Sequence, residues 1–111
     1  MWKCDVCGQN IERAEDGWVE AWSYRDPATG KGGDRDLRLV HAYTASPRGP
    51  GGCQFNEEVE LAKGRVGCPA DVSLADLLGK DGLKRLRATF KAAPQAELER
   101  LIKLLHPASS S

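Results

Sequence analysis

The sequence predicts an α+β fold in which a zinc-stapled knuckle and an antiparallel β-hairpin precede two or three C-terminal helices. Three features indicate it: a CxxC pair at Cys4 and Cys7, two segments with a period-two pattern, and a helical pattern from Ser73 onward. If the segment after Cys53 forms a helix capped by Asn56, the arrangement becomes treble-clef-like.

Length and composition indicate a single small domain with a thin core. The 111 residues fit one zinc-binding domain, which we place at residues 1–107. Within it, 1–64 form the knuckle and hairpin part and 73–107 the helical part, while 108–111 are expected to be a disordered tail. Many of the 41% hydrophobic residues are alanines, and the chain also has 12 glycines and six prolines. A chain with so few large apolar side chains needs a further cross-link for stability, which the four cysteines can supply.

Charge and targeting signals favour a cytoplasmic protein without a membrane partner. Sixteen basic residues balance sixteen acidic ones, so no overall field draws the chain to nucleic acid or to an anionic membrane. The start lacks the apolar core of a signal peptide, and no run is apolar enough to cross a bilayer. In a reducing compartment these cysteines favour a metal over disulfides, because the thiols stay reduced and a thiolate is a soft ligand.

The first half of the chain is expected to form a knuckle and then a hairpin. Between residues 2 and 11 the CxxC pair interrupts a short strand, and Gly8 can take the positive φ that the turn requires. An aromatic-rich strand over 18–24, a mobile loop over 25–36 and a return strand over 37–43 follow. Parity places four side chains of the return strand on its inward face: Leu37, Leu39, His41 and Tyr43.

The stretch after Cys53 can be a helix or a strand. A loop over 44–52 delivers Cys53, and Asn56 is then a candidate cap for a short helix that ends at Gly64. A strand competes, because apolar and acidic residues also alternate here, but we favour the helix. The side chains that would then face inward are Phe55, Val59 and Ala62.

The last third of the chain is expected to be helical. Ser73 is a candidate cap, with Asp76 as the acid of a capping box, and Asp81 and Gly82 restart a helix after Gly79. The apolar stripe of this second helix is Leu83, Leu86 and Phe90. A final helix begins at Pro94 and ends at His106 and Pro107, and its apolar residues are Leu98, Leu101, Ile102 and Leu105.

The strongest motif is the CxxC pair, because two intervening residues let both thiolates reach one tetrahedral ion while nearby amides bond the sulfurs. The candidates for the two further ligands are His41, Cys53, Cys68 and His106. His41 lies late on an inward strand face, and Cys53 follows a loop that can fold back. We therefore predict a structural Zn²⁺ held by Cys4, Cys7, His41 and Cys53, and leave open whether Cys68 replaces Cys53.

Enzymatic readings of the cysteines are disfavoured. A thioredoxin-like dithiol precedes a helix, whereas a hairpin follows this CxxC. A catalytic zinc needs an open position and a nearby carboxylate, and a nuclease needs a further histidine beside the metal. We therefore expect no enzyme, a buried or half-exposed thiol at Cys68, and a residue at a helix C-terminus at His106.

Basic residues near the C-terminus form the one dense stripe of a single charge. They follow helical spacing, which suits contact with phosphates but is also typical of a solvated helix face, and we favour the second reading. The possible nucleic-acid contacts are Lys80, Lys84, Arg85, Arg87 and Lys91. The three tryptophans, Trp2, Trp18 and Trp22, are expected mostly in the core.

Five segments of the sequence, WKCDVCGQNI, GWVEAW, LRLVHAY, GCQF and SLADLLGKDGLKRL, carry a resemblance. Together they resemble a group of small uncharacterised bacterial and phage proteins with a CxxC…H…C pattern and a helical L-G-x-D-G-L segment near the C-terminus. The group has no assigned activity. The resemblance implies metal ligands at Cys4, Cys7, His41 and Cys53, and the chain departs from it in the long gap between the last two.

The function expected from the sequence is a non-enzymatic protein-interaction or regulatory module stapled by zinc. The alternative is a nucleic-acid-binding protein that uses the basic stripe from Lys80 to Lys91. The identity of the partner, the pathway and the oligomeric state are left open by the sequence.

Overall fold

The computed structural model confirms the α+β class: a two-stranded sheet, a three-stranded sheet and four α-helices. It describes residues 1–25, 28–47 and 52–105. The two-stranded sheet pairs β1 (Trp2–Lys3) with β2 (Asn10–Ile11). The other sheet has the order β4-β3-β5 and is antiparallel throughout, with bounds β3 Gly17–Arg25, β4 Gly32–His41 and β5 Cys68–Ser73.

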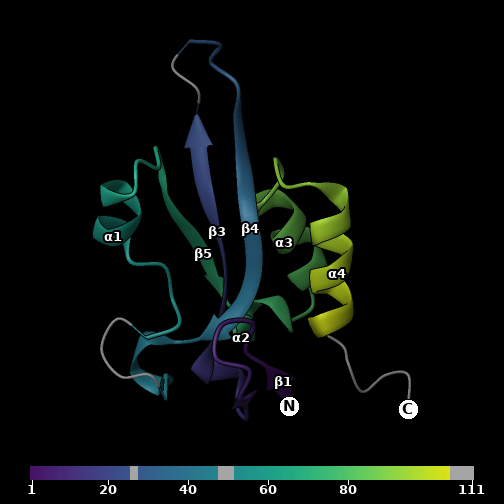
Figure 1. Ribbon diagram of the computed structural model, residues 1–111. Coiled ribbons are helices and arrows are strands. Elements are labelled where there is room, and N and C mark those ends of the chain that lie inside the picture. Colours follow the sequence, from purple (N-terminus) through teal and green to yellow (C-terminus); the bar gives the residue numbers. More distant parts are fainter. Residues whose placement is uncertain (26–27, 48–51, 106–111) are drawn as a thin grey trace.

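The helices lie on both sides of the three-stranded sheet. Their bounds are η1 Ala14–Asp16, η2 Tyr43–Ala45, α1 Glu57–Ala62, α2 Leu74–Leu77, α3 Gly82–Thr89 and α4 Gln95–Leu105. Figure 1 shows α1 on one side of the strands and α3 and α4 on the other, with the N-terminal knuckle near α2. The prediction of two or three C-terminal helices is confirmed, and their number is three: α2, α3 and α4. The predicted stop at His106 and Pro107 and the tail 108–111 lie outside the described residues.

The main hydrophobic core lies between the sheet and the C-terminal helices. The sheet contributes Val19, Ala21, Leu37, Leu39 and Val72, and the helices contribute Leu74, Leu77, Leu86, Phe90, Leu98, Leu101 and Leu105. Cys4, Ile11 and Cys53 belong to the same cluster of buried residues. The knuckle and the Cys53 segment are therefore packed against the core that the helices close.

The knuckle forms as expected. Trp2 pairs with Ile11 and Lys3 with Asn10, and the amide of Cys4 donates to the carbonyl of Gln9 at 2.9 Å. Gly8 has a φ of 77°, which a residue with a side chain rarely adopts, and its amide donates to the Cys4 carbonyl at 3.0 Å. This turn directs both thiols of the CxxC pair to one side.

The hairpin is longer than predicted. The predicted loop 25–36 is wrong in its second half, because β4 already begins at Gly32 and pairs with β3 from there. The register of the β3–β4 ladder shifts between Glu20 and Trp22. At the same level β4 has a β-bulge, where Asp36 takes a φ of 57°. Backbone pairing needs no apolar side chains, so a polar, glycine-rich stretch extends the strand. Residues 26–27 of that loop lie outside the described part of the chain.

Strand β5 was not predicted from the sequence. Its six residues, CPADVS, contain a proline and an aspartate, and only Val72 is fully buried. Pro69 lies opposite Trp22 on β3, and because β5 is an edge strand the missing amide removes no ladder bond at the centre of the sheet. Pairing with a strand distant in the chain therefore makes this segment extended.

The helix after Cys53 is confirmed, but its orientation is not the predicted one. Asn56 caps α1 by accepting from the Val59 amide at 3.3 Å. Phe55 is half-buried, whereas Val59 and Ala62 are exposed, which corrects the prediction that both face inward. The segment before this short helix attaches it to the sheet: Phe55 packs edge-on against Trp22 of β3, with ring centroids 5.8 Å apart.

Three further predictions about facing side chains have mixed outcomes. Leu86 and Phe90 are fully buried as expected, but Leu83 is 49% exposed, because Gly82 rather than Leu83 packs α3 against the end of α2. Tyr43 is 54% exposed, because β4 ends at His41 and the chain turns into η2. Trp22 is buried, and Trp2 and Trp18 are partly buried against the core.

Candidate metal centre

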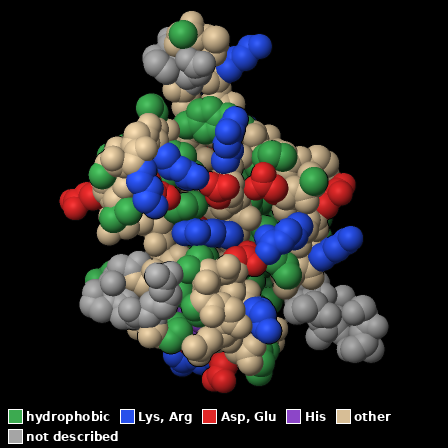
Figure 2. Space-filling model, viewed as in Figure 1, with side chains coloured by type: hydrophobic (Ala, Val, Ile, Leu, Met, Phe, Trp, Pro, Cys, Tyr) green, Lys and Arg blue, Asp and Glu red, His purple; other side chains and the backbone are tan. Residues whose placement is uncertain are grey.

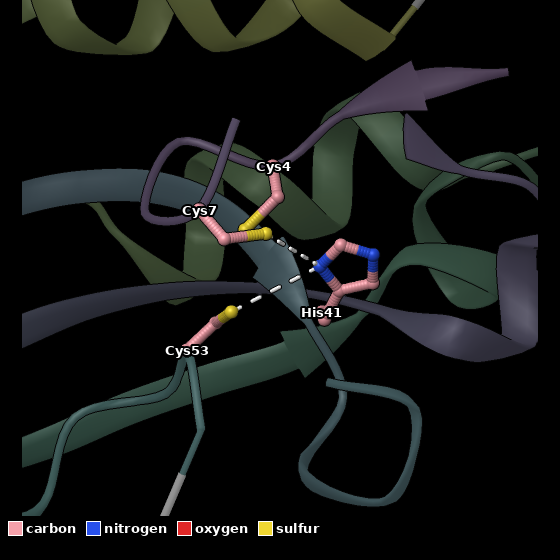
Figure 3. A group of neighbouring side chains, drawn as sticks. All are labelled: Cys4, Cys7, His41 and Cys53. Atoms are coloured by element: carbon pink, nitrogen blue, oxygen red, sulfur yellow. Dashed lines mark hydrogen bonds between the residues drawn. The ribbon is translucent and has the colours of Figure 1, made fainter. Parts of the chain in front are cut away.

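Four side chains from three parts of the chain meet at the knuckle end of the sheet. Cys4 and Cys7 come from the knuckle, His41 from the last residue of β4, and Cys53 from the segment before α1 (Figure 3). Their sulfur and nitrogen atoms all lie within 4.8 Å of one another. Neighbouring ligand atoms in a tetrahedral zinc site are about 3.5–3.8 Å apart, given Zn–S and Zn–N bonds near 2.3 and 2.0 Å. The cluster can therefore hold one metal ion.

The ring of His41 is oriented for ligation through Nδ1. Nδ1 lies 3.4 Å from Cys7 Sγ and 3.9 Å from Cys53 Sγ. The other ring nitrogen, Nε2, lies 2.9 Å from the carbonyl oxygen of Asn10. A carbonyl oxygen only accepts, so Nε2 carries the hydrogen and the lone pair of Nδ1 points at the thiols. A hydrogen bond to a backbone carbonyl is one of the common ways in which the ring of a metal-binding histidine is oriented.

The thiols are in unequal environments. Burial opposes ionisation of Cys4, but hydrogen bonds from the Cys7 and Val6 amides outweigh it and lower the pKa of this thiol to about 7. Burial raises the pKa of Cys53 to about 11, although the Ser46 hydroxyl, 3.2 Å from Sγ, opposes the shift. Without a metal Cys4 is thus a readier thiolate than Cys53, and a cation beside Cys53 would favour ionisation of its buried thiol.

The knuckle is fixed to both the sheet and the last helix. The Asp5 amide donates to the Leu39 carbonyl at 2.7 Å, and the Asp5 carboxylate accepts from the Leu39 amide at 2.9 Å. Arg100 on α4 donates to the other oxygen of that carboxylate. The indole of Trp2 donates to the Leu105 carbonyl at 3.1 Å. The CxxC pair therefore sits on a rigid support beside β4.

Cys68 is excluded from the cluster by the register of the sheet. It pairs with Ser23 on β3, whereas His41 pairs with Gly17, six residues earlier on that strand. Six residues of strand span roughly 20 Å. The Cys68 thiol is exposed and free, contrary to the expected buried or half-exposed position. The structure thus brings Cys53 to the cluster, and His106 lies outside the described residues.

Several residues that support the cluster were not found from the sequence. The Asn10 carbonyl, the Ser46 hydroxyl and the Asp5 carboxylate act through contacts that no local pattern reveals. Glu20 had a signal: it is an acidic residue on the same strand face as Trp18 and Trp22. A charged group on a buried, aromatic-rich face needs a partner of opposite charge, because burying an unpaired charge is costly. Arg38 is the partner of Glu20.

The basic stripe is fully on the surface. All five of its side chains are exposed, and Arg85 lies 3.8 Å from Asp76. Three of them, Lys80, Lys84 and Arg85, line a shallow hollow of about 460 Å³ together with Asp76 and Asp81. Figure 2 shows Lys and Arg side chains interspersed with Asp and Glu over the visible face of the molecule.

Comparison of the chain with protein-family models, with curated proteins and with solved structures finds no match. Within the part of the chain that the structure describes, none of the helices has the length and apolar character needed to cross a membrane. What the fold and site define is a small α+β protein with a Cys₃His cluster able to hold a metal ion. Its role has to be inferred from that cluster and from the surfaces around it.

Proposed function

We propose that this chain binds one structural Zn²⁺ ion through Cys4, Cys7, His41 and Cys53 and acts in the cytoplasm as a non-enzymatic protein-interaction or regulatory module. The observation that carries the proposal is the convergence of four ligand atoms within 4.8 Å. Membership of the bacterial and phage group that the chain resembles is part of the same proposal, and its support is the shared order of ligands.

The chemistry of the donor set favours zinc. Thiolates and imidazole together select a borderline-soft cation, and a Cys₃His set around a tetrahedral ion is typical of structural zinc. Cys4 and Cys53 are each 1% exposed and His41 is 5% exposed, while Cys7 is half-buried, so three of the four ligands are shielded from water. Four protein ligands leave no open position for a substrate or an activated water, and a structural rather than catalytic metal follows.

The position of the cluster also supports a structural role. It joins the knuckle, the end of β4 and the segment before α1, which are separated by long stretches of chain. Zinc would cross-link these three parts, and in a domain with a thin core such binding contributes directly to the free energy of folding.

An interaction role is supported by the surface around α1. Three apolar side chains there are exposed by about half or more: Val59, Leu61 and Val66 at 48%, 47% and 63%. Isolated exposed apolar residues are ordinary, but three within one short segment favour contact with another protein. The segment follows Cys53 directly, so a metal at the cluster would hold it against the sheet.

Binding of nucleic acid is the second candidate, and the exposed basic stripe favours it. Only one of the five stripe residues, Arg85, has an ion pair among the described residues, so most of the positive charge is available to phosphates. Acidic side chains among the cations weaken such an attraction, and we keep protein interaction as the first choice.

Affinity capture tests these two alternatives. Tagged wild-type chain and the Cys7→Ser variant are used as bait, each with untreated and with nuclease-treated cell extract. We expect a protein that is retained by the wild type after nuclease treatment and lost with Cys7→Ser. Recovery of nucleic acid alone, or of a partner only when nucleic acid is intact, would overturn the protein-interaction role in favour of the second candidate.

A further inference from the structure

An ion pair between a buried carboxylate and a half-buried guanidinium lies next to the cluster without belonging to it. Glu20 on β3 is 1% exposed and lies opposite Arg38 on β4, whose Nε donates to its carboxylate at 2.7 Å. The same carboxylate accepts from the Phe55 amide at 3.0 Å. Asp71 on β5 lies on the other side of Glu20 in the ladder. Burying a carboxylate costs desolvation free energy, which its hydrogen bonds must offset. The partners of those hydrogen bonds therefore indicate its role.

The pair holds the segment that carries Cys53 at two points. Arg38 Nη2 donates to the Cys53 carbonyl oxygen at 3.3 Å, and its guanidinium lies 3.8 Å from the centre of the Phe55 ring. Glu20 holds the Phe55 amide, two residues further along. Between them, the Gln54 side chain accepts from the Tyr43 amide at 2.7 Å. The backbone on both sides of Gln54 is therefore bonded to the sheet.

Cys53 is the cluster member that needs such support. Cys4 and Cys7 lie in a hydrogen-bonded knuckle, and His41 lies on a strand. Cys53 lies in neither helix nor strand, and α1 begins only at Glu57. Its sulfur is also further from His41 Nδ1, at 3.9 Å against 3.4 Å for Cys7.

We propose that Glu20 and Arg38 are positioning residues for the metal: they hold Cys53 in place as the fourth ligand and so slow the loss of the ion. This inference rests on the proposed function, namely that the cluster binds Zn²⁺. Loss of zinc to a chelator starts with one ligand leaving the ion, and the ligand on the least regular segment leaves first. A segment bonded at Cys53 and Phe55 returns its thiolate before the chelator can take its place.

The test compares zinc loss in Glu20→Gln and Arg38→Lys with that in wild type. Glu20→Gln keeps the size and one acceptor oxygen but removes the charge that binds Arg38. Arg38→Lys keeps the positive charge but removes the fork that reaches both Glu20 and Cys53. The matched control is Asp36→Asn, which breaks the ion pair of Asp36 with Arg65, whose guanidinium lies over the rings of Trp22 and Phe55. Asparagine tolerates the positive φ of that position, and no hydrogen bond of this pair reaches Cys53 among the described residues.

Zinc-loaded proteins are mixed with a chromophoric chelator, and far-UV circular dichroism verifies that each variant is folded. We expect Glu20→Gln and Arg38→Lys to lose zinc about 10-fold faster or more, because removing partners that orient metal ligands costs about 10–100-fold in metal affinity. Asp36→Asn should stay within about 2-fold of wild type. In the cobalt-substituted variants we expect weaker thiolate-to-metal absorption, because Cys53 spends less time bound.

Two outcomes overturn the proposal. One is a wild-type rate in both variants with unchanged cobalt spectra; the other is equally fast loss in Asp36→Asn, which would assign the effect to general loosening of the segment. If Arg38→Lys does not fold, Glu20→Gln alone decides. Wild-type protein that takes up neither zinc nor cobalt would instead refute the proposed function, a result distinct from any difference between variants.

Discussion

The imidazole Nε2 of His41 donates to the carbonyl oxygen of Asn10 at 2.9 Å, and this bond joins the end of β4 to the return strand of the knuckle. It sets the tautomer in which Nδ1 is free to bind a metal. The same contact brings the histidine beside the CxxC pair, so one hydrogen bond contributes both to the chemistry and to the position of the ligand.

One zinc ion per chain is the expected metal content of protein purified without chelator. Native mass spectrometry measures it directly. Removal of the ion should lower the melting temperature by at least about 10 °C, because each kcal/mol of lost stability is worth roughly 4–8 °C in a domain of this size. A mass equal to the bare polypeptide, or two ions per chain, would contradict the assignment.

Serine substitutions should separate the cluster cysteines from Cys68. We expect Cys4→Ser, Cys7→Ser and Cys53→Ser each to lose the metal or unfold, because a neutral hydroxyl does not replace a thiolate. Cys68→Ser is the matched control and should retain one zinc with an unchanged melting temperature, since its thiol is exposed at the distant end of β5. Metal content and thermal unfolding are measured on all four variants; zinc retained in Cys53→Ser and lost in Cys68→Ser would refute the ligand set.

Two glycines near the turn between α2 and α3 should respond in opposite ways to alanine. A Cβ at Gly82 would lie 1.7 Å from the Leu77 backbone oxygen, whereas at Gly79 the nearest atom is 3.6 Å away. Gly82→Ala should cost about 2–3 kcal/mol or more, because backbone must move to admit the methyl group. Gly79→Ala should change stability by no more than about 0.5–1 kcal/mol, with a gain favoured. Urea unfolding of the two variants measures the change in stability. Equal effects would contradict the close approach of α2 and α3 at Gly82.

The basic stripe is expected to leave nucleic acid unbound at physiological salt. If it does bind phosphates, the affinity should fall steeply with salt, with a slope that corresponds to roughly four contacts at most. Fluorescence anisotropy with a labelled duplex and a single strand measures this, using Lys84→Glu combined with Arg87→Glu as the comparison. A submicromolar, salt-sensitive complex that this double variant abolishes would reverse our choice between the two candidate functions.

Local signals predicted the N-caps of α1 and α2 correctly, whereas Asp81 at the start of α3 makes no side-chain cap. Asn56 accepts from the Val59 amide and Ser73 from the Asp76 amide, and both bonds span three residues. Such contacts depend only on the order of neighbouring residues, which the sequence contains in full. The same is true of the turn at Gly8, where φ is 77°.

The side on which a residue lies was predicted less well. Val59 and Leu83 fit apolar helical stripes, yet both are about half exposed. Which face of a short helix is covered depends on what the flanking segments bind, here Phe55 for α1 and Gly82 for α3. A periodic pattern shows which residues share one face of a helix, but it does not show which other part of the chain covers that face.

The sequence by itself determined the donor types and the N-caps at Asn56 and Ser73, because these follow from side-chain chemistry and from contacts within a few residues. Only the tertiary structure decided that Cys53, and not Cys68, joins Cys4, Cys7 and His41. That choice depends on β5, a strand whose polar sequence becomes extended by pairing with β3 and so carries Cys68 to the far end of the sheet. It depends equally on the pair of Glu20 and Arg38, which bonds the backbone at Cys53 and Phe55 across β3 and β4. Pairing between distant strands and burial of charged groups are properties of the assembled chain, since the partners meet only when the chain has folded.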